Sequence, residues 1–284
     1  MSLESFPPLL LICARFVMSG SLMLAAIALR GGKLPRGRDL RTACFSGVLV
    51  LGIGNGALVF AEQWVPSGLA CLMITISPFW MVGVEALLPG GERLHLPTIL
   101  GMLVGLCGAA LLFAPDMHTH TFHAGLVSGF LVLQLGMAGW AFGSIYQRRQ
   151  VTGTHPMVIG AVQQLAAGLS FLPLVLLIHE HPVHWSPRGV LAILYLVMFG
   201  SIVGYSAYIF ALDRLPVAIA SIYPYVNSVV AVTLGWLFYR EAFGAREAVA
   251  MAIIFAGVAL VKRYSHVPAP ARVSQAAGSM AVDR

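Results

Sequence analysis

One basic side chain, Arg15, lies well inside a long apolar run, Pro8–Leu29. If that run crosses a membrane, a guanidinium there costs about 2.5–3.5 kcal/mol on insertion scales, which makes Arg15 a candidate for function. Its planar fork of donors can bind a carboxylate through two parallel hydrogen bonds. The alternative is structural, because a long arginine side chain can also extend to the interface or bond to backbone carbonyls.

Three uncharged polar side chains are candidates to form a site with Arg15. Gln163 stands 148 residues after Arg15, and Asn227 stands 150 residues after Ser77. A proline lies within three residues of both Ser77 and Asn227, and a proline frees backbone polar groups for water or substrate. We therefore expect these four side chains to form a binding site near the membrane midplane. Hydrogen bonding between helices, worth about 0.6–2 kcal/mol per bond, is the alternative.

Aromatic side chains form a second group of candidates. Tyr205 and Tyr208 are three residues apart, so they share one face of a helix. Together with Trp140, Tyr223 and Tyr225, they could line a cavity that accepts amphipathic or cationic solutes by stacking and cation–π contact. The alternative is a role at the membrane interface, where aromatic residues near span ends usually act as anchors.

The composition determines which elements can position these residues. Of the 284 residues, 58% are apolar and 10% are charged, whereas about a quarter of a soluble domain is charged. A chain of this kind cannot cover its own core with polar surface, which argues strongly against a soluble enzyme. The formal charge of +6 indicates cytoplasmic loops rather than nucleic-acid binding. All four cysteines lie within apolar runs, which predicts buried thiols rather than a disulfide framework or metal cluster.

Nine apolar runs approach the length of about 20 residues that a helix needs to cross a membrane. The segment that follows them, 263–284, is rich in Ala, Pro and Ser and is expected to be a disordered cytoplasmic tail. The sequence therefore predicts an all-α integral membrane protein. The expected spans are Pro8–Leu29, Thr42–Ala61, Ser67–Leu88, Thr98–Ala114, Gly125–Tyr146, Pro156–Ile178, Gly189–Ala211, Val217–Phe238 and Ala245–Val261.

Basic residues are distributed unevenly between the two sides of the membrane. With the chain start placed outside, thirteen Lys and Arg fall in inside segments and three in outside segments. Because cytoplasmic loops carry the excess of basic residues, this predicts a multi-pass inner-membrane protein with a cytoplasmic carboxyl terminus. All nine histidines fall in loops, at span ends or in the tail, which argues against a membrane haem protein. A metal site among the histidines of the outer loops is the alternative that these residues leave open.

The chain matches itself at a shift of about 149 residues, which indicates an internal repeat. The segment Gly54–Ala70 supplies six identities with Gly204–Ala220 at a shift of 150. We expect a first repeat at 1–114 and a second at 125–262. Since one repeat holds an odd number of spans, the second copy must be inverted in the membrane, which is the architecture of secondary transporters.

The two repeats are unequal in the number of spans. The second begins with Gly125–Tyr146, and the partner of that span in the first repeat would precede Met1. Without that partner, Arg15 would face lipid. We therefore expect the native chain to begin about 25–35 residues further upstream, with one more span. The genomic sequence before the Met1 codon tests this expectation, and a nine-span protein is the alternative.

Four motifs carry a family resemblance: Gly54–Ala70 (GNGALVFAEQWVPSGLA), Trp140–Tyr146 (WAFGSIY), Gln164–Gly168 (QLAAG) and Tyr223–Gly235 (YPYVNSVVAVTLG). They resemble the EamA family of the drug/metabolite transporter superfamily, in its branch of YedA-like exporters. The resemblance implies ten spans in two inverted five-helix repeats, of which four plus five are visible here. It also implies export of small metabolites, often amino acids or toxic amphiphiles. Asn55, in the first motif, joins the candidate binding residues.

These observations lead us to expect a secondary transporter that exports small organic metabolites by alternating access. Its expected partners are a small-molecule solute and the lipid bilayer, with protons as a candidate coupling ion and with no nucleic acid and no cofactor. The alternatives are an intramembrane enzyme and a non-transporting membrane scaffold. An enzyme would need a paired Asp, a Ser–His or a Ser–Lys set at membrane depth. Every Asp falls in a loop or the tail, and no Lys falls within a span.

Overall fold

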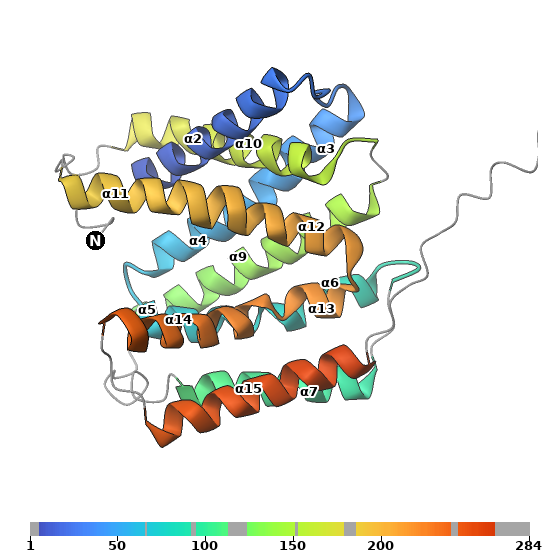
Figure 1. Cartoon of the computed structure of the whole chain (residues 1–284), viewed down its shortest axis with the longest axis vertical. Coiled ribbons are helices and arrows are strands. Elements are labelled where there is room, and N and C mark those ends of the chain that lie inside the picture. Colours follow the sequence, from blue (N-terminus) through green and yellow to red (C-terminus); the bar gives the residue numbers. More distant parts are fainter. Residues whose placement is uncertain are drawn as a thin grey trace, which may run out of the picture.

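Every element in the described part of the chain is a helix, and the long helices cross the molecule from one end to the other (Figure 1). The computed structural model describes residues 6–65, 67–91, 95–112, 124–150, 153–178, 186–239 and 244–264. A bilayer offers no water to backbone amides, so a spanning segment must satisfy them internally, as a helix does. The helices are α2 (Pro8–Leu29), α3 (Arg38–Gly47), η1 (Val48–Ile53), α4 (Gly54–Ala61), α5 (Ser67–Ile74), α6 (Ser77–Leu87), α7 (Leu96–Leu112), α9 (Ala124–Arg149), α10 (Pro156–Leu177), α11 (Pro187–Tyr195), η2 (Leu196–Tyr205), α12 (Ser206–Arg214), α13 (Val217–Ser221), α14 (Tyr223–Tyr239) and α15 (Ala245–Tyr264).

Two of the spans are continuous rods built from three consecutive segments. The first rod, Arg38–Ala61, joins α3, η1 and α4, and the second rod, Pro187–Arg214, joins α11, η2 and α12. The middle segment of each rod is a π-helical stretch. These stretches overlap when the chain is shifted by 150 residues, so both repeats contain one. Short π-helical turns within α-helices are frequent at functional sites.

Seven helical stretches in the described residues are long and apolar enough to cross a membrane, and the all-α membrane fold is thereby confirmed. The two other expected spans correspond to α7 and α15, which are not among these seven. α7 has only 17 described residues, and α15 carries charged side chains in its first and last turns. Charges at the ends of a helix can reach the membrane interface. α15 continues through Arg263 and Tyr264, two residues expected in the tail; the rest of that tail and the outer-loop histidines lie outside the described residues.

The two repeats pack against each other through corresponding helices. α2 lies along α10, and α7 lies along α15 (Figure 1). Gly20 and Gly168 match at a shift of 148 residues, and neither has room for a side chain. A Cβ atom on Gly20 would lie 2.6 Å from the Leu165 backbone nitrogen, and one on Gly168 would lie 2.7 Å from that of Val17. α2 and α10 therefore touch backbone to backbone, as small residues allow in membrane proteins.

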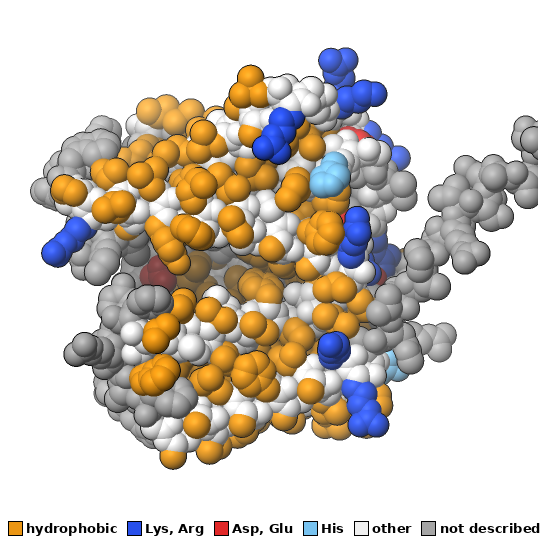
Figure 2. Space-filling model, viewed as in Figure 1, with side chains coloured by type: hydrophobic (Ala, Val, Ile, Leu, Met, Phe, Trp, Pro, Cys, Tyr) orange, Lys and Arg blue, Asp and Glu red, His pale blue; other side chains and the backbone are white. Residues whose placement is uncertain are grey.

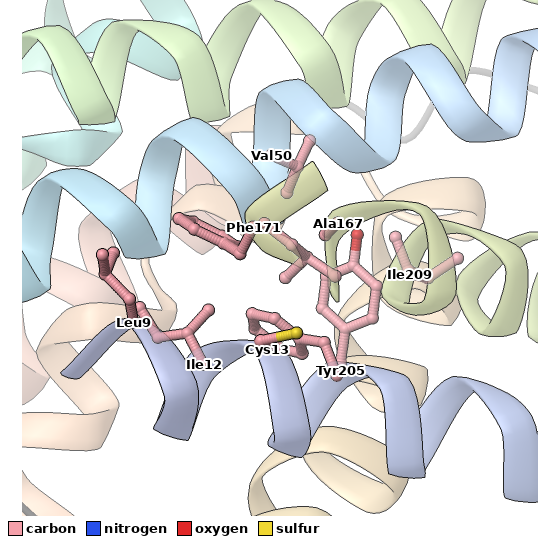
Figure 3. Close-up of a cluster of buried hydrophobic side chains, with 10 residues drawn as sticks. Leu9, Ile12, Cys13, Val50, Ala167, Phe171, Tyr205 and Ile209 are labelled. Atoms are coloured by element: carbon pink, nitrogen blue, oxygen red, sulfur yellow. The ribbon is translucent and has the colours of Figure 1, made fainter. Parts of the chain in front are cut away.

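A cluster of apolar side chains holds α2 and α10 against both rods (Figure 3). Phe16 of α2 and Phe171 of α10 pack there with Val50 of the first rod and Tyr205 of the second rod. In a bilayer such contacts stabilise the fold through close packing, because lipid tails are as apolar as the side chains. The cluster fixes the position of Tyr205, which also lines the site described below.

The repeats differ in how their rods are covered. α9 packs across the first rod and α6, and a Cβ atom on Gly54 would lie 2.8 Å from Cε3 of Trp140 in α9. No described helix occupies the corresponding place on the second rod. There, Gly204 and Ala207 are exposed, whereas their counterparts Gly54 and Ala57 are buried and half-buried. The described part of the first repeat thus has four spans, against five in the second.

Two of the four cysteines correct the expectation of buried thiols. Cys13 is buried and Cys44 is half-buried, but Cys71 and Cys107 are exposed. The visible surface of the described helices is largely apolar (Figure 2). In a membrane protein the outer surface contacts lipid, so an apolar thiol is as compatible with that surface as with the interior.

Candidate functional site

A cavity of about 470 Å³ lies between the two repeats. It is lined by residues of α2, α9, α14 and both rods. Figure 2 shows a hollow between the second rod and the neighbouring α13 and α14. Inverted-repeat transporters hold their substrate at such an interface between repeats. Six of the nine candidate residues line this cavity: Arg15, Asn55, Trp140, Tyr205, Tyr208 and Asn227.

Arg15 contributes the only charge among the residues that line the cavity. Its Nε donates a hydrogen bond to Ser201 Oγ at 2.7 Å, and its guanidinium carbon lies 5.1 Å from the centre of the Phe16 ring. Among the described residues, the structure gives the guanidinium no acidic partner and no second hydrogen bond. Nη1 and Nη2 therefore keep their donors for a ligand, and a carboxylate matches this pair of donors.

Four aromatic residues, Trp140, Tyr205, Tyr208 and Tyr223, form one side of the cavity and are called the aromatic wall here. The centre of the Trp140 ring lies 5.4 Å from that of Tyr208 and 6.2 Å from that of Tyr223. Tyr208 holds the wall together, because its hydroxyl accepts a hydrogen bond from Trp140 Nε1 at 2.8 Å and shares another with Ser144 Oγ at 2.8 Å. The wall can bind the apolar or aromatic part of a solute by stacking.

The remaining three candidates lie outside the lining of the cavity. Ser77 is buried at the start of α6, and its Oγ has no partner among the described residues. Tyr225 is fully buried and donates a hydrogen bond to the Met102 carbonyl at 3.0 Å, so it joins α14 to α7. Gln163 is fully buried behind the aromatic wall, where its Oε1 accepts a hydrogen bond from the Tyr205 hydroxyl at 2.9 Å. The expected midplane cluster of four polar residues is thus reduced to Arg15 and Asn227.

Two polar lining residues, Tyr223 and Ser201, were not among the nine predicted site residues. Tyr223 opens the Tyr223–Gly235 motif and was considered only as an aromatic candidate, so its motif position was the available signal. Ser201 is one of two serines in its apolar run, and nothing in that run distinguishes it from a hydroxyl that bonds its own backbone. Its importance appears only when α2 and the second rod are placed together, because that contact brings it to Arg15.

The comparisons with known proteins agree with this architecture. The family model for the EamA-like transporter family matches residues 1–114 and 127–263. The chain is 35% identical over 260 residues to the uncharacterized inner membrane transporter YedA of Escherichia coli K12, covering 91% of this chain and 82% of that protein. It is 30% identical over 249 residues to a probable terminal-alkyne amino-acid exporter of Streptantibioticus cattleyicolor, covering 87% and 81%.

A solved crystal structure shares the fold. It superposes with a TM-score of 0.77 at 24% sequence identity, and the match covers 92% of this chain and 89% of that one. Together with the apolar helices and the cavity between two halves, the sequence matches identify the chain at the level of its family. The protein is a member of the EamA-like transporter family.

Proposed function

We propose that the protein is a secondary transporter that exports small carboxylate-bearing metabolites, such as amino acids, by alternating access. In this proposal the repeats at 1–114 and 125–262 move against each other around the central cavity. Arg15 binds the carboxylate, and the aromatic wall binds the apolar or amphipathic remainder of the solute. Asn55 and Asn227 supply further hydrogen bonds.

The observation that carries the proposal is the guanidinium of Arg15, which has no acidic partner among the described residues and lines the same cavity as the aromatic wall. A single cation in a cavity favours an anionic group, and stacking favours an apolar or aromatic body beside it. An amino acid with a large side chain combines both features. One relative is named a probable terminal-alkyne amino-acid exporter, which supports amino acids as the class of solute.

Uptake into proteoliposomes tests the proposal. Purified protein is reconstituted, and the initial uptake of a panel of labelled amino acids, other carboxylates and their uncharged amides is measured. We expect saturable uptake of carboxylates with large apolar side chains, and little uptake of the amides. Absence of transport for the whole panel would favour a non-transporting scaffold, and chemical conversion of a solute would favour an intramembrane enzyme.

Glu62 is a candidate group for proton coupling, which the same uptake experiment can test. It follows the last residue of α4, at the end of the first rod, and it is half-buried. Burial raises the pKa of this carboxyl, because the charged form is desolvated, and a raised pKa favours proton uptake. The panel is therefore repeated with an imposed pH gradient. Faster transport with the gradient than without it supports coupling, and equal rates support facilitated diffusion.

We also propose that the end of the molecule rich in Lys and Arg, called the basic end here, faces the cytoplasm together with the carboxyl terminus. The blue side chains in Figure 2 gather mainly toward one end of the bundle, and cytoplasmic segments carry such an excess. A cysteine placed at Thr119, which lies outside the described residues, is expected in an external loop. An impermeant thiol reagent should label it in whole cells, and labelling only after lysis would reverse the orientation.

A further inference from the structure

Among the polar contacts that join one repeat to the other, two are made by residues that match under the internal repeat. In the first, Arg15 of α2 donates to Ser201 of the second rod at 2.7 Å. In the second, Gln163 Nε2 of α10 donates to Ser46 Oγ of the first rod at 2.7 Å. Arg15 and Gln163 match at a shift of 148 residues, and each reaches the rod of the opposite repeat. The two contacts therefore correspond in the helices that carry Arg15 and Gln163, whereas their serine partners, 155 residues apart, occupy different positions along the rods.

The contacts lie on opposite sides of the membrane midplane. α10 begins at Pro156, near the basic end, and α2 begins at Pro8, at the opposite end. Arg15 and Gln163 are each the eighth residue of their helix, which places each about 10 Å from the start of that helix. Arg15 thus lies toward the end opposite the basic end, and Gln163 lies toward the basic end.

The two contacts differ in whether they line the central cavity. Arg15 and Ser201 both line the central cavity, whereas Gln163 and Ser46 are buried outside its lining. Tyr205 stands between them, because it lines the cavity and its hydroxyl donates to Gln163. The cavity therefore reaches the contact on one side of the midplane and is closed from the contact on the other.

Gln163 also connects to a second, polar pocket. Its Nε2 donates to Gln147 Oε1 as well as to Ser46 Oγ, so the amide uses both N–H groups. Gln147 in turn lines a pocket of about 180 Å³ near the basic end, together with Gln150, Thr154 and Asp213. One buried amide is thus bonded to the wall of the central cavity and to the wall of the polar pocket.

We propose that Gln163, with Tyr205, Gln147 and Ser46, forms the gate that closes the central cavity toward the basic end. This cluster of four residues is called the basic-end gate. This inference rests on the proposed transport function. When the cavity opens toward the basic end, the four residues separate, and the solute has a polar route from the cavity to the pocket at Gln147. The Arg15–Ser201 contact is already formed in this state, in the lining of the cavity, and is not part of this gate. Neutral hydrogen bonds between membrane helices are individually weak, which suits contacts that must break in each cycle.

Cysteine accessibility tests the gate without any substrate. A reporter Leu58→Cys, at a lining position, is placed in a variant whose native cysteines are replaced by alanine. An impermeant thiol reagent is applied from each side, in whole cells and in inverted vesicles. We expect Gln163→Leu to raise the labelling rate from the basic end about tenfold, which corresponds to a shift of about 1.4 kcal/mol in the gate equilibrium.

Gln164→Leu is the matched control. Gln164 is also completely buried in α10, but its partners are Ser19 and Met23 of α2 and it has no bond to the gate. This variant should label like the unmodified reporter. Ser46→Ala, a smaller change, should open the gate in the same direction if Gln163→Leu fails to fold.

Unchanged labelling from the basic end in the folded Gln163→Leu and Ser46→Ala variants would overturn the gate, as would equal acceleration by Gln164→Leu. The readout separates this inference from the proposed function. If the variants show the expected labelling but the protein transports none of the panel, the proposed function is wrong and the gate is supported. If the protein transports the panel but the variants show unchanged labelling, only the gate is wrong.

Discussion

Replacing Arg15 by alanine is expected to lower kcat/KM for carboxylate-bearing solutes about 100-fold, with a nearly unchanged yield of folded protein. Among the described residues, Nη1 and Nη2 of the guanidinium have no hydrogen-bond partner, since the bond to Ser201 involves Nε. Truncating one partner of a buried, hydrogen-bonded charge pair costs about 2–5 kcal/mol, and a 100-fold loss corresponds to about 2.8 kcal/mol. Initial rates of uptake into proteoliposomes measure the effect.

Two controls separate binding from a structural role of Arg15. Arg15→Lys keeps the charge but loses the planar fork, so it should retain part of the activity. Arg188→Ala removes an exposed arginine at the start of α11 and should transport like the unmodified protein. A loss of folded Arg15→Ala protein, with unchanged activity per folded molecule, would mean that the arginine serves the fold alone.

The helices of this protein follow closely from its sequence, because the signals involved are local. Apolar runs of sufficient length predict spans, and glycine spacing predicts close packing. Gly101 and Gly108 in α7 are an example: they lie seven residues apart in the sequence, and a Cβ atom on either would lie within 3.0 Å of α15. The repeat was likewise visible from matched residues, and matched glycines such as Gly20 and Gly168 do meet the corresponding helix.

The rotation of each helix could not be predicted in the same way. Tyr223 and Tyr225 share one motif, but residues two apart on a helix point about 200° apart. Tyr223 therefore faces the cavity while Tyr225 packs against α7. In a soluble protein, polar residues identify the outer face of each helix in the sequence. A lipid-facing surface is as apolar as the interior, so that signal is absent here. The sequence consequently gave no sign that Cys71 and Cys107 face outward.

The repeat symmetry also misled the prediction of the site. It correctly paired Arg15 with Gln163, and the expectation was that both would line one cavity. A protein with inverted repeats alternates between states in which the two halves are not equivalent. In the state seen here, the cavity includes Arg15 and excludes Gln163. Sequence matching identifies counterparts, but it cannot tell which counterpart a given state exposes.

Arg149→Ala is expected to lower the stability of the folded protein by about 3 kcal/mol. Arg149 Nη2 lies 2.9 Å from Glu85 Oε1, and Nη1 donates to the Pro89 carbonyl at 2.8 Å. The Glu85 side chain is only 10% exposed. Removing one partner of a buried ion pair costs about 3–5 kcal/mol, because the other charge is left uncompensated. Because the Arg149 side chain is 30% exposed, we expect a loss of stability at the lower end of this range.

Thermal unfolding of the purified protein in detergent measures this loss, and a double variant identifies its cause. Glu85→Gln removes the carboxylate charge, so adding it to Arg149→Ala should recover much of the lost stability. Arg214→Ala provides the matched control, because this exposed arginine at the end of α12 lies over the Phe210 ring and forms no ion pair with a described acidic residue. If Arg149→Ala unfolded at the same temperature as Arg214→Ala, the ion pair between α6 and α9 would contribute nothing to the fold. If the double variant were no more stable than Arg149→Ala, the loss would come from the Pro89 contact rather than from the buried charge of Glu85.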